Sequence, residues 1–174
     1  MLFRSNLGDH HLLNLYRLSM IVGTMKDVDF SAMASIDLMS GLPNEGKDAL
    51  TKGKVGGDLM AQANTLLAND KDTLPALAAE AAKQTNGEID VKLGESYLTY
   101  NRNDEAVAAL QKGIEKGGIK DLADAQTTLG IALLRAGKKA EAIALFDKAG
   151  EGNSPAAIVA HTWSLFAKRN TAPA

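Results

Sequence analysis

One block of sequence occurs twice in this chain at an interval of 36 residues, and this repeat constrains the fold more than any other feature. The first copy, at residues 93–113, reads LGESYLTYNRNDEAVAALQKG, and the second, at residues 129–149, reads LGIALLRAGKKAEAIALFDKA. Small and large residues take the same places in both copies, so that Gly94 corresponds to Gly130. Self-similarity at a fixed period of about 20 to 50 residues indicates a protein in which one small unit stacks on the next.

Each copy has the residue sizes of two helices joined by a turn. The second half of each copy places apolar residues at the spacing of one helix face. We expect Gly94 and Gly130, in the first helices, to let a neighbouring helix come close. Leu110 and Phe146, in the second helices, would then fill the interior. Because aromatic residues make up only 5% of the chain, the core must consist largely of Ala, Leu, Ile, Val and Met.

The pattern resembles the tetratricopeptide repeat, which has a period of about 34 residues and the signature W-x2-L-G-x2-Y…A-x3-F…P. The two clear copies span Gly87–Lys120 and Ala123–Pro155. They depart from the signature because Asp90 and Gln126 stand where it has Trp, and only the second copy ends near a Pro. The resemblance implies an all-α protein in which antiparallel helix hairpins stack as a short right-handed solenoid.

The rest of the chain is expected to extend this array within a single domain of residues 1–174. The expected parts are degenerate N-terminal helices with a TPR-like hairpin (9–56), a spacer hairpin (57–86), the two repeats (87–120 and 123–155) and a capping helix (156–169). The spacer hairpin would consist of two short helices, Gly57–Leu67 and Asp72–Lys83. Pro75 suits the first turn of the second of these helices.

The first helix, in HHLLNLYRLSMIVG, is apolar on more than one side, and the sequence before it offers no partner. The ends of solenoids need a polar outer face, so we expect this helix to dock onto missing upstream repeats or to self-associate. The order of motifs over residues 11–169 resembles the C-terminal part of a larger bacterial tetratricopeptide-repeat protein. That resemblance implies a periplasmic or secreted intact protein, although this chain shows no signal peptide. Asn14 and Arg17 interrupt the longest apolar stretch, so no membrane span is expected.

Composition and motifs give little support to catalysis or to cofactor binding. The net charge of −2, with both signs mixed along the chain, argues against a nucleic-acid surface, and the absence of Cys excludes thiolate chemistry. His10 and His11 are adjacent and would point apart on a helix, and His161 is expected to be a packing residue. The glycine pairs Gly56-Gly57 and Gly117-Gly118 do not belong to a GxxxxGK(S/T) phosphate-binding motif. We therefore expect no catalytic residue, no cofactor and no metal site.

The remaining candidate site is the concave face, which the first helices of stacked hairpins line. Its exposed residues would be Glu88, Lys92, Glu95, Thr99, Asp124, Thr127, Ile131 and Arg135. The leading hypothesis is a non-enzymatic protein–protein interaction scaffold that accepts a helix or an extended peptide on this face. The alternative is a structural, self-associating fragment of a longer repeat array, and an enzyme is the remotest of the three hypotheses.

Overall fold

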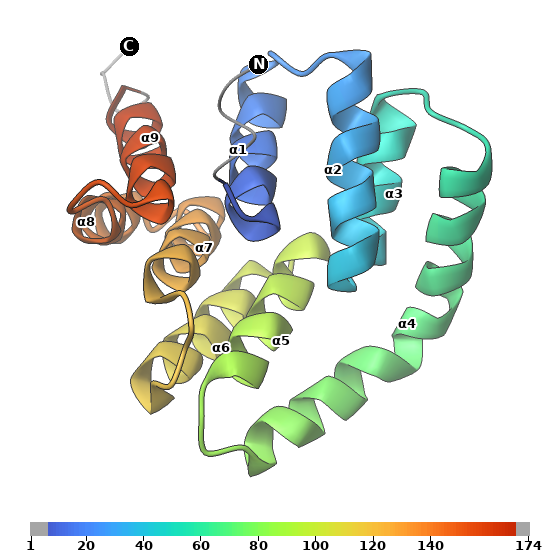
Figure 1. The fold of residues 1–174 in the computed structure, drawn as a ribbon. Coiled ribbons are helices and arrows are strands. Elements are labelled where there is room, and N and C mark those ends of the chain that lie inside the picture. The colour runs from blue at the N-terminus through green and yellow to red at the C-terminus, as the bar shows by residue number, and fades with distance from the viewer. Residues whose placement is uncertain (1–6, 170–174) are drawn as a thin grey trace.

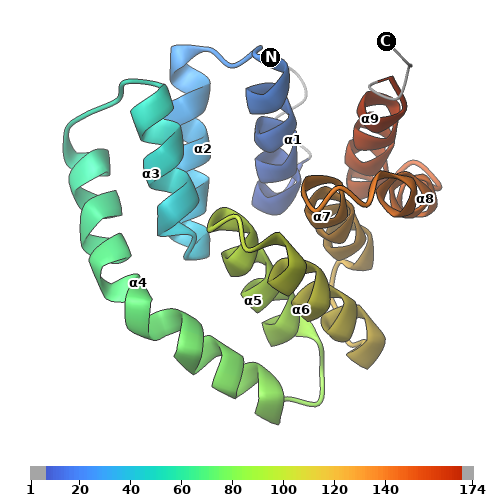
Figure 2. The same ribbon diagram turned by 180° about the vertical axis from the view of Figure 1, so that it is seen from behind.

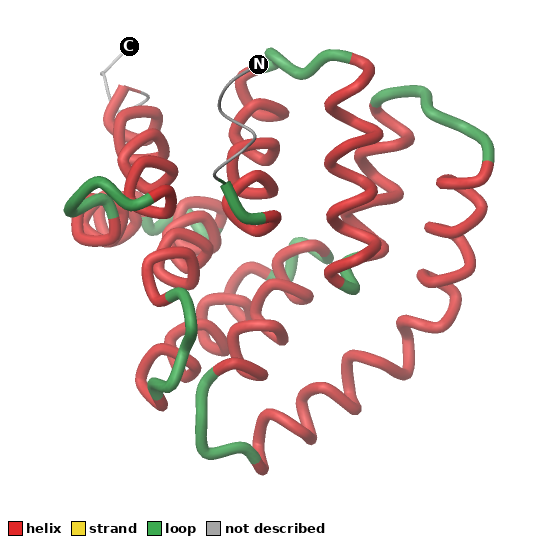
Figure 3. Tube along the Cα trace, viewed as in Figure 1, coloured by secondary structure: helices red, strands yellow, loops and turns green. Residues whose placement is uncertain are grey.

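The computed structural model describes residues 7–169, apart from the side chains at positions 71 and 72, and within this range it contains nine α-helices and no strand (Figures 1 and 3). The helices are α1 (Asp9–Val22), α2 (Asp27–Ser40), α3 (Pro43–Lys52), α4 (Asp58–Lys83), α5 (Glu88–Thr99), α6 (Asn103–Lys116), α7 (Leu122–Arg135), α8 (Lys139–Ala149) and α9 (Pro155–Arg169). This confirms the predicted all-α class.

Consecutive helices pack on each other along most of the chain. The pairs α5–α6 and α7–α8 contain the two copies of the repeated sequence, and α2 packs on α3 in the region where an upstream hairpin was expected. Short turns join the helices of each pair. After α7, for example, Gly137 adopts a left-handed backbone conformation, and Lys138 N–H donates to the carbonyl of Leu133 at 2.9 Å. Such a turn ends a helix while satisfying its last carbonyls.

The two repeat glycines lie where the sequence pattern places them. A Cβ atom on Gly94 would stand 2.5 Å from Cγ of Leu110, and one on Gly130 would stand 2.4 Å from Cε1 of Phe146. Leu110 and Phe146 are completely buried. The predicted pairing of a small residue in each first helix with a large residue in each second helix is therefore confirmed.

The predicted spacer hairpin is wrong, because residues 58–83 form the single 26-residue helix α4. Pro75 lies inside this helix rather than at the start of a second one. An interior proline removes one backbone hydrogen bond and bends a helix, and α4 is visibly bent in Figure 1. The bent helix reaches from α3 to α5 and packs on both. Its buried Asp70 accepts a hydrogen bond from the hydroxyl of Tyr100, at the end of α5.

The first helix finds its partners within the same chain. In Figures 1 and 2, α1 lies between α2 on one side and α7 with α9 on the other, and it packs on all three. Leu13, Tyr16 and Leu18 of α1 are buried. These residues therefore have partners within the chain, and docking of α1 onto upstream repeats or self-association stays a prediction. A helix that is buried on several sides needs apolar residues on several sides.

Helix α9 packs on the last hairpin, α7–α8, and on α1. Its Trp163 is fully buried and stacks on Phe146 of α8, with ring centroids 5.8 Å apart. Trp163 also reaches α1, which makes α9 a link between the last hairpin and the first helix. Within residues 7–169, none of the helices has both the length and the hydrophobicity that a bilayer crossing requires.

Candidate functional site

The eight residues predicted to line an exposed concave face do lie on α5 and α7, but most of them are covered. Lys92 is exposed, and Glu88 and Arg135 are half-buried. The other five are buried: Glu95, Thr99, Asp124, Thr127 and Ile131. Their predicted exposure is wrong, because α1 and the neighbouring helices pack over this face. The repeat pattern predicts the contacts within one hairpin, but it does not predict which other helix packs over that hairpin.

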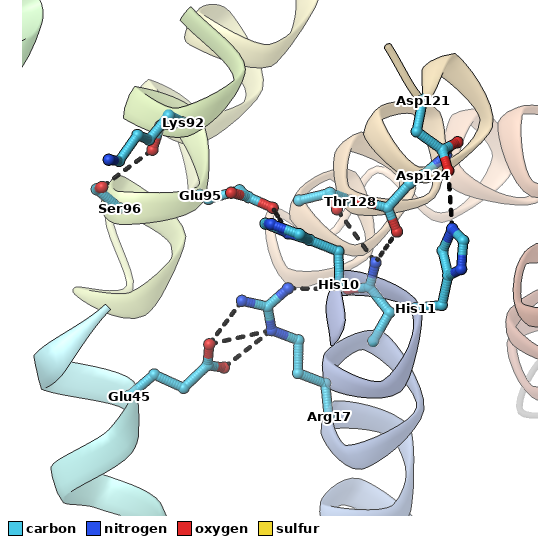
Figure 4. A network of polar contacts seen from close by, with 11 residues as sticks. His10, His11, Arg17, Glu45, Lys92, Glu95, Ser96, Asp121, Asp124 and Thr128 are labelled. Carbon is cyan, nitrogen blue, oxygen red and sulfur yellow. Dashed lines mark hydrogen bonds and ion pairs between the residues drawn. The ribbon is translucent and has the colours of Figure 1, made fainter. Parts of the chain in front are cut away.

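Polar side chains fasten α1 to α7 (Figure 4). Asn14, which is almost completely buried, donates from Nδ2 to Asp124 Oδ1 at 3.0 Å and to Thr128 Oγ1 at 3.3 Å. Nearby, Nε2 of His11 lies 2.8 Å from Oδ2 of Asp121. Because a buried amide must find hydrogen-bond partners, these contacts fix the position of α1 along α7.

A buried ion pair fastens the same helix to α3. Arg17, only 2% exposed, donates from Nη2 to Glu45 Oε2 at 2.6 Å and from Nε to both oxygens at 3.0 and 3.1 Å. Its Nη1 donates to Asn14 Oδ1 at 2.8 Å. Burial alone would raise the pKa of Glu45. The charge of Arg17 and its hydrogen bonds lower this pKa by more than burial raises it, so the net shift is downward. Glu45 therefore stays ionised opposite Arg17.

Asp37 of α2 is fully buried beside this pair, and neither of its oxygens has a donor within the described residues. Burial and the negative charge of Glu45 raise the pKa of Asp37 well above its ordinary value. Two carboxylates cannot donate to one another. Protonation of Asp37, in contrast, would allow it to donate to Glu45, and such a bond would further lower the pKa of Glu45.

A third group of polar residues joins α1, α5 and α7 (Figure 4). Nδ1 of His10 lies 3.4 Å from Oε1 of buried Glu95, and Asp124 brings a second buried carboxylate to the same place. The hydrogen bond and charge of Glu95 raise the pKa of His10 to about 9. Burial and the charge of Glu95 raise the pKa of Asp124 to about 6. Sequence analysis missed this convergence because the three residues belong to three separate helices.

Two cavities adjoin at the C-terminal end of α1. The larger, of about 660 Å³, lies between α1, α3 and the ends of α5 and α7, and the smaller, of about 380 Å³, lies between α1, α7 and α9. Ile21 and Arg135 line both cavities. We call their combined surface the α1-end groove. Its other lining residues include Arg17, Glu45, Lys47, Asp48, Lys52, Leu134, Trp163 and Phe166.

Arg135 is the one residue of the predicted face that borders both cavities. Its Nη1 donates to the carbonyl of Leu98 at 3.3 Å, and no carboxylate lies within ion-pair distance of it in residues 7–169. Burial lowers the pKa of Arg135, although its guanidinium stays charged at neutral pH. A half-buried guanidinium of this kind can bind a carboxylate through two parallel hydrogen bonds.

Comparisons of this chain with protein-family models, with curated proteins and with solved structures find no match. The resemblance to tetratricopeptide repeats therefore depends on the residues and helices of this chain alone.

Proposed function

We propose that this chain is a non-enzymatic module of tetratricopeptide-like hairpins that binds a peptide segment of a partner protein in the α1-end groove. The observation that carries the proposal is the pair of adjoining cavities beside Arg135, at the place where α1 ends and stops covering the inner face. Their sizes, about 660 and 380 Å³, fall in the range of ordinary ligand sites. Side chains of a bound peptide could occupy both at once.

The chemistry of the groove favours a segment that places an acidic residue beside apolar ones. The smaller cavity is bordered by Leu134 and Phe166, whose partly exposed side chains offer an apolar surface to aliphatic or aromatic side chains. In the larger cavity, the positive charges of Arg17 and Lys52 are matched by Glu45 and Asp48.

Two further cations of the groove lack such a match. Lys47 and Arg135 have no carboxylate within ion-pair distance in the described part of the chain. They leave the groove with a positive excess, and opposite charges attract most strongly at a site that excludes water. An acidic side chain of the peptide would therefore bind at Arg135.

The position of α1 also supports a peptide-binding role. The inner face already accepts one amphipathic helix, through apolar residues such as Leu13 and through hydrogen bonds to Asn14. Binding of a helix in a groove is a common mode of peptide recognition. A partner segment that follows the end of α1 would extend the same mode of packing.

Selection from a random peptide display library on the immobilised protein tests this proposal. We expect enrichment of sequences that combine Asp or Glu with large apolar residues. Synthetic peptides of this kind should bind in a fluorescence titration, and Arg135→Gln should weaken the binding by about tenfold or more, because a charge-assisted hydrogen bond contributes about 1.5–3 kcal/mol.

Lys92→Gln is the matched control, since Lys92 belongs to the face predicted from sequence but does not line the α1-end groove. It should leave peptide binding unchanged. A selection that enriches no sequence, or peptides that bind Arg135→Gln as tightly as the original protein, would contradict the proposal.

A second candidate function is assembly through α9. Ile158 and Leu165 are 53% and 55% exposed, and they lie seven residues apart on one face of this helix. Such a face could continue the array with another helical surface. Sedimentation at several concentrations, repeated with Ile158→Lys, tests it. A protein that stays monomeric throughout would exclude self-association.

A further inference from the structure

Three helices bring metal-binding atoms to one point on the inner face. His10 of α1, Glu95 of α5 and Asp124 of α7 each direct one nitrogen or oxygen there, and these atoms all lie within 4.8 Å of one another. Figure 4 shows the His10 and Glu95 side chains facing each other above α1. The side chain of His10 is 51% exposed, which gives an ion a path from solvent. The two carboxylates are more than nine-tenths buried.

The contact between His10 and Glu95 is long for a charge-assisted hydrogen bond, and its length also suits two ligands of one metal ion. Their atoms Nδ1 and Oε1 are 3.4 Å apart, whereas a charge-assisted N–H···O bond is about 2.7–2.9 Å long. Two ligands at about 2.0–2.1 Å from a tetrahedral Zn²⁺ stand about 3.3 Å apart. The observed separation therefore corresponds to one edge of a tetrahedral zinc site.

The carboxylates also keep oxygens that are not used for other contacts. Among the described residues, His10 is the only polar partner of Glu95. Asp124 accepts from Asn14 through Oδ1, while its Oδ2 accepts no hydrogen bond in the same part of the chain. Buried carboxylates normally satisfy their oxygens with hydrogen bonds or metal ions, so these two have spare capacity for a cation.

The charges around the cluster favour a cation as well. The nearby positive charge of Arg17 is matched by Glu45, with which it forms a buried ion pair. His11 is paired with Asp121. This leaves two buried carboxylates, Glu95 and Asp124, opposite the single imidazole of His10, whose proton a bound metal ion would displace.

We propose that His10, Glu95 and Asp124 form a binding site for a divalent transition-metal ion of the Zn²⁺ type. One imidazole and two carboxylates supply three ligands, and the exposed side of His10 leaves a fourth position for water. Asn14, which donates to Asp124, orients that carboxylate, as partners of metal ligands commonly do. The ion would join α1 to α5 and α7 and so hold the first helix over the inner face. This inference does not depend on the proposed peptide binding.

Calorimetric titration of the tag-free full chain with Zn²⁺, after removal of metals by EDTA, tests the site. We expect one equivalent to bind and the melting temperature to rise, since a ligand that binds only the folded state stabilises it. With Co²⁺ in place of Zn²⁺, the visible absorption of a four-coordinate ion should appear and should disappear when Zn²⁺ is added.

Glu95→Gln and His10→Gln each remove one ligand and keep a similar shape. Loss of a partner of a ligand already weakens metal binding by about 10–100-fold, so each substitution should weaken Zn²⁺ binding by more than about tenfold. His161→Gln is the matched control, because this exposed histidine lies outside the cluster. It should bind Zn²⁺ as the original protein does.

Circular dichroism of each variant checks that its helices are intact. Zn²⁺ binding that survives in both Glu95→Gln and His10→Gln would overturn the proposal, and so would the absence of any Zn²⁺ binding by the original protein. Loss of binding in His161→Gln alone would place the metal elsewhere and would also overturn it.

Discussion

Trp163 donates its indole N–H to the backbone oxygen of Asn14 at 3.0 Å, and so joins two residues that lie 149 positions apart. The contact connects α9, at the end of the described chain, to α1 at its beginning. On the other side of α1, Arg17 reaches α3. Helix α1 therefore links helices from the beginning and the end of the described chain, and its buried polar contacts should matter for the stability of the whole protein.

Trp163→Phe should lower the free energy of unfolding by about 1–3 kcal/mol. The substitution removes one hydrogen bond, which contributes about 1 kcal/mol, and it leaves a small cavity where the indole is fully buried. Urea denaturation followed by circular dichroism measures the change. Leu165→Ala, at an exposed position of the same helix, should change stability by less than about 0.5 kcal/mol. Equal effects of the two substitutions would show that the contact with Asn14 contributes nothing.

Arg17→Met should destabilise the protein by about 3–5 kcal/mol, because it leaves Glu45 charged and buried without a partner. The double variant Arg17→Met/Glu45→Gln should recover much of this loss, since it removes the unpaired charge. Urea denaturation of the three proteins at one pH gives the comparison.

The control for this ion pair is Lys52→Met. Lys52 and Asp48 form a pair four residues apart on α3, and both side chains are about half exposed. Exposed pairs contribute about 0–1 kcal/mol, so the control should change little. A double variant that is no more stable than Arg17→Met would mean that the arginine acts through packing rather than through its charge.

Gly130→Ala should destabilise the protein by about 1–3 kcal/mol, although alanine is the better helix former. The new Cβ would stand 2.4 Å from a ring carbon of Phe146, which is fully buried and stacked on Trp163. Gly56→Ala is the control, because a Cβ there meets no atom within 4 Å. Thermal unfolding distinguishes the two. An alanine at position 130 that leaves the melting temperature unchanged would show that α8 can move away at little cost.

The hairpins could be predicted from the sequence because their information is local. Gly94 and Leu110 are close in sequence and recur as Gly130 and Phe146, so that size and spacing together define the contact. Residues within one helix hairpin have few possible partners because they are close in sequence. The second copy repeats the same spacing of small and large residues, which supports the same pairing. The turns could also be predicted from the sequence, since glycine favours the left-handed conformation that ends a helix.

The place of α1 could not be predicted, because it depends on contacts between distant residues. Asn14 meets Asp124 across 110 positions and Thr128 across 114. In the sequence, Asn14 and Arg17 appeared only as polar interruptions of an apolar stretch. Polar residues within a helix that is apolar on several sides indicate a partner within the same chain. They do not identify which helix that partner is. The candidate metal ligands lie on three helices for the same reason.

The error at α4 has a different cause. Pro75 is compatible with the first turn of a new helix and also with a bend inside a longer one. The sequence between positions 67 and 72 contains no glycine that would end a helix. This absence, rather than the presence of proline, was the informative feature.

Asp37→Asn should make the protein more stable at neutral pH, and the gain should grow as the pH rises from about 4. The pKa of Asp37 is raised well above its ordinary value, first by burial and then by the charge of Glu45. The folded state therefore keeps a proton that the unfolded chain releases, so stability falls as the pH rises from the unfolded pKa through the folded one. The slope is at most about 1.4 kcal/mol per pH unit.

Asparagine resembles the protonated acid in shape, cannot ionise and can donate its amide hydrogens to Glu45. The charged groups that face position 37 are Glu45 of α3, Arg17 of α1 and, less strongly, Glu95 of α5, and all three are unchanged in the variant. Urea denaturation of both proteins at matched pH values between about 4 and 8 isolates the contribution of Asp37, because other titrations cancel in the difference. A difference in unfolding free energy that stays constant over this range would mean that Asp37 titrates alike in the folded and unfolded states. In that case Glu45 would not share a proton with it.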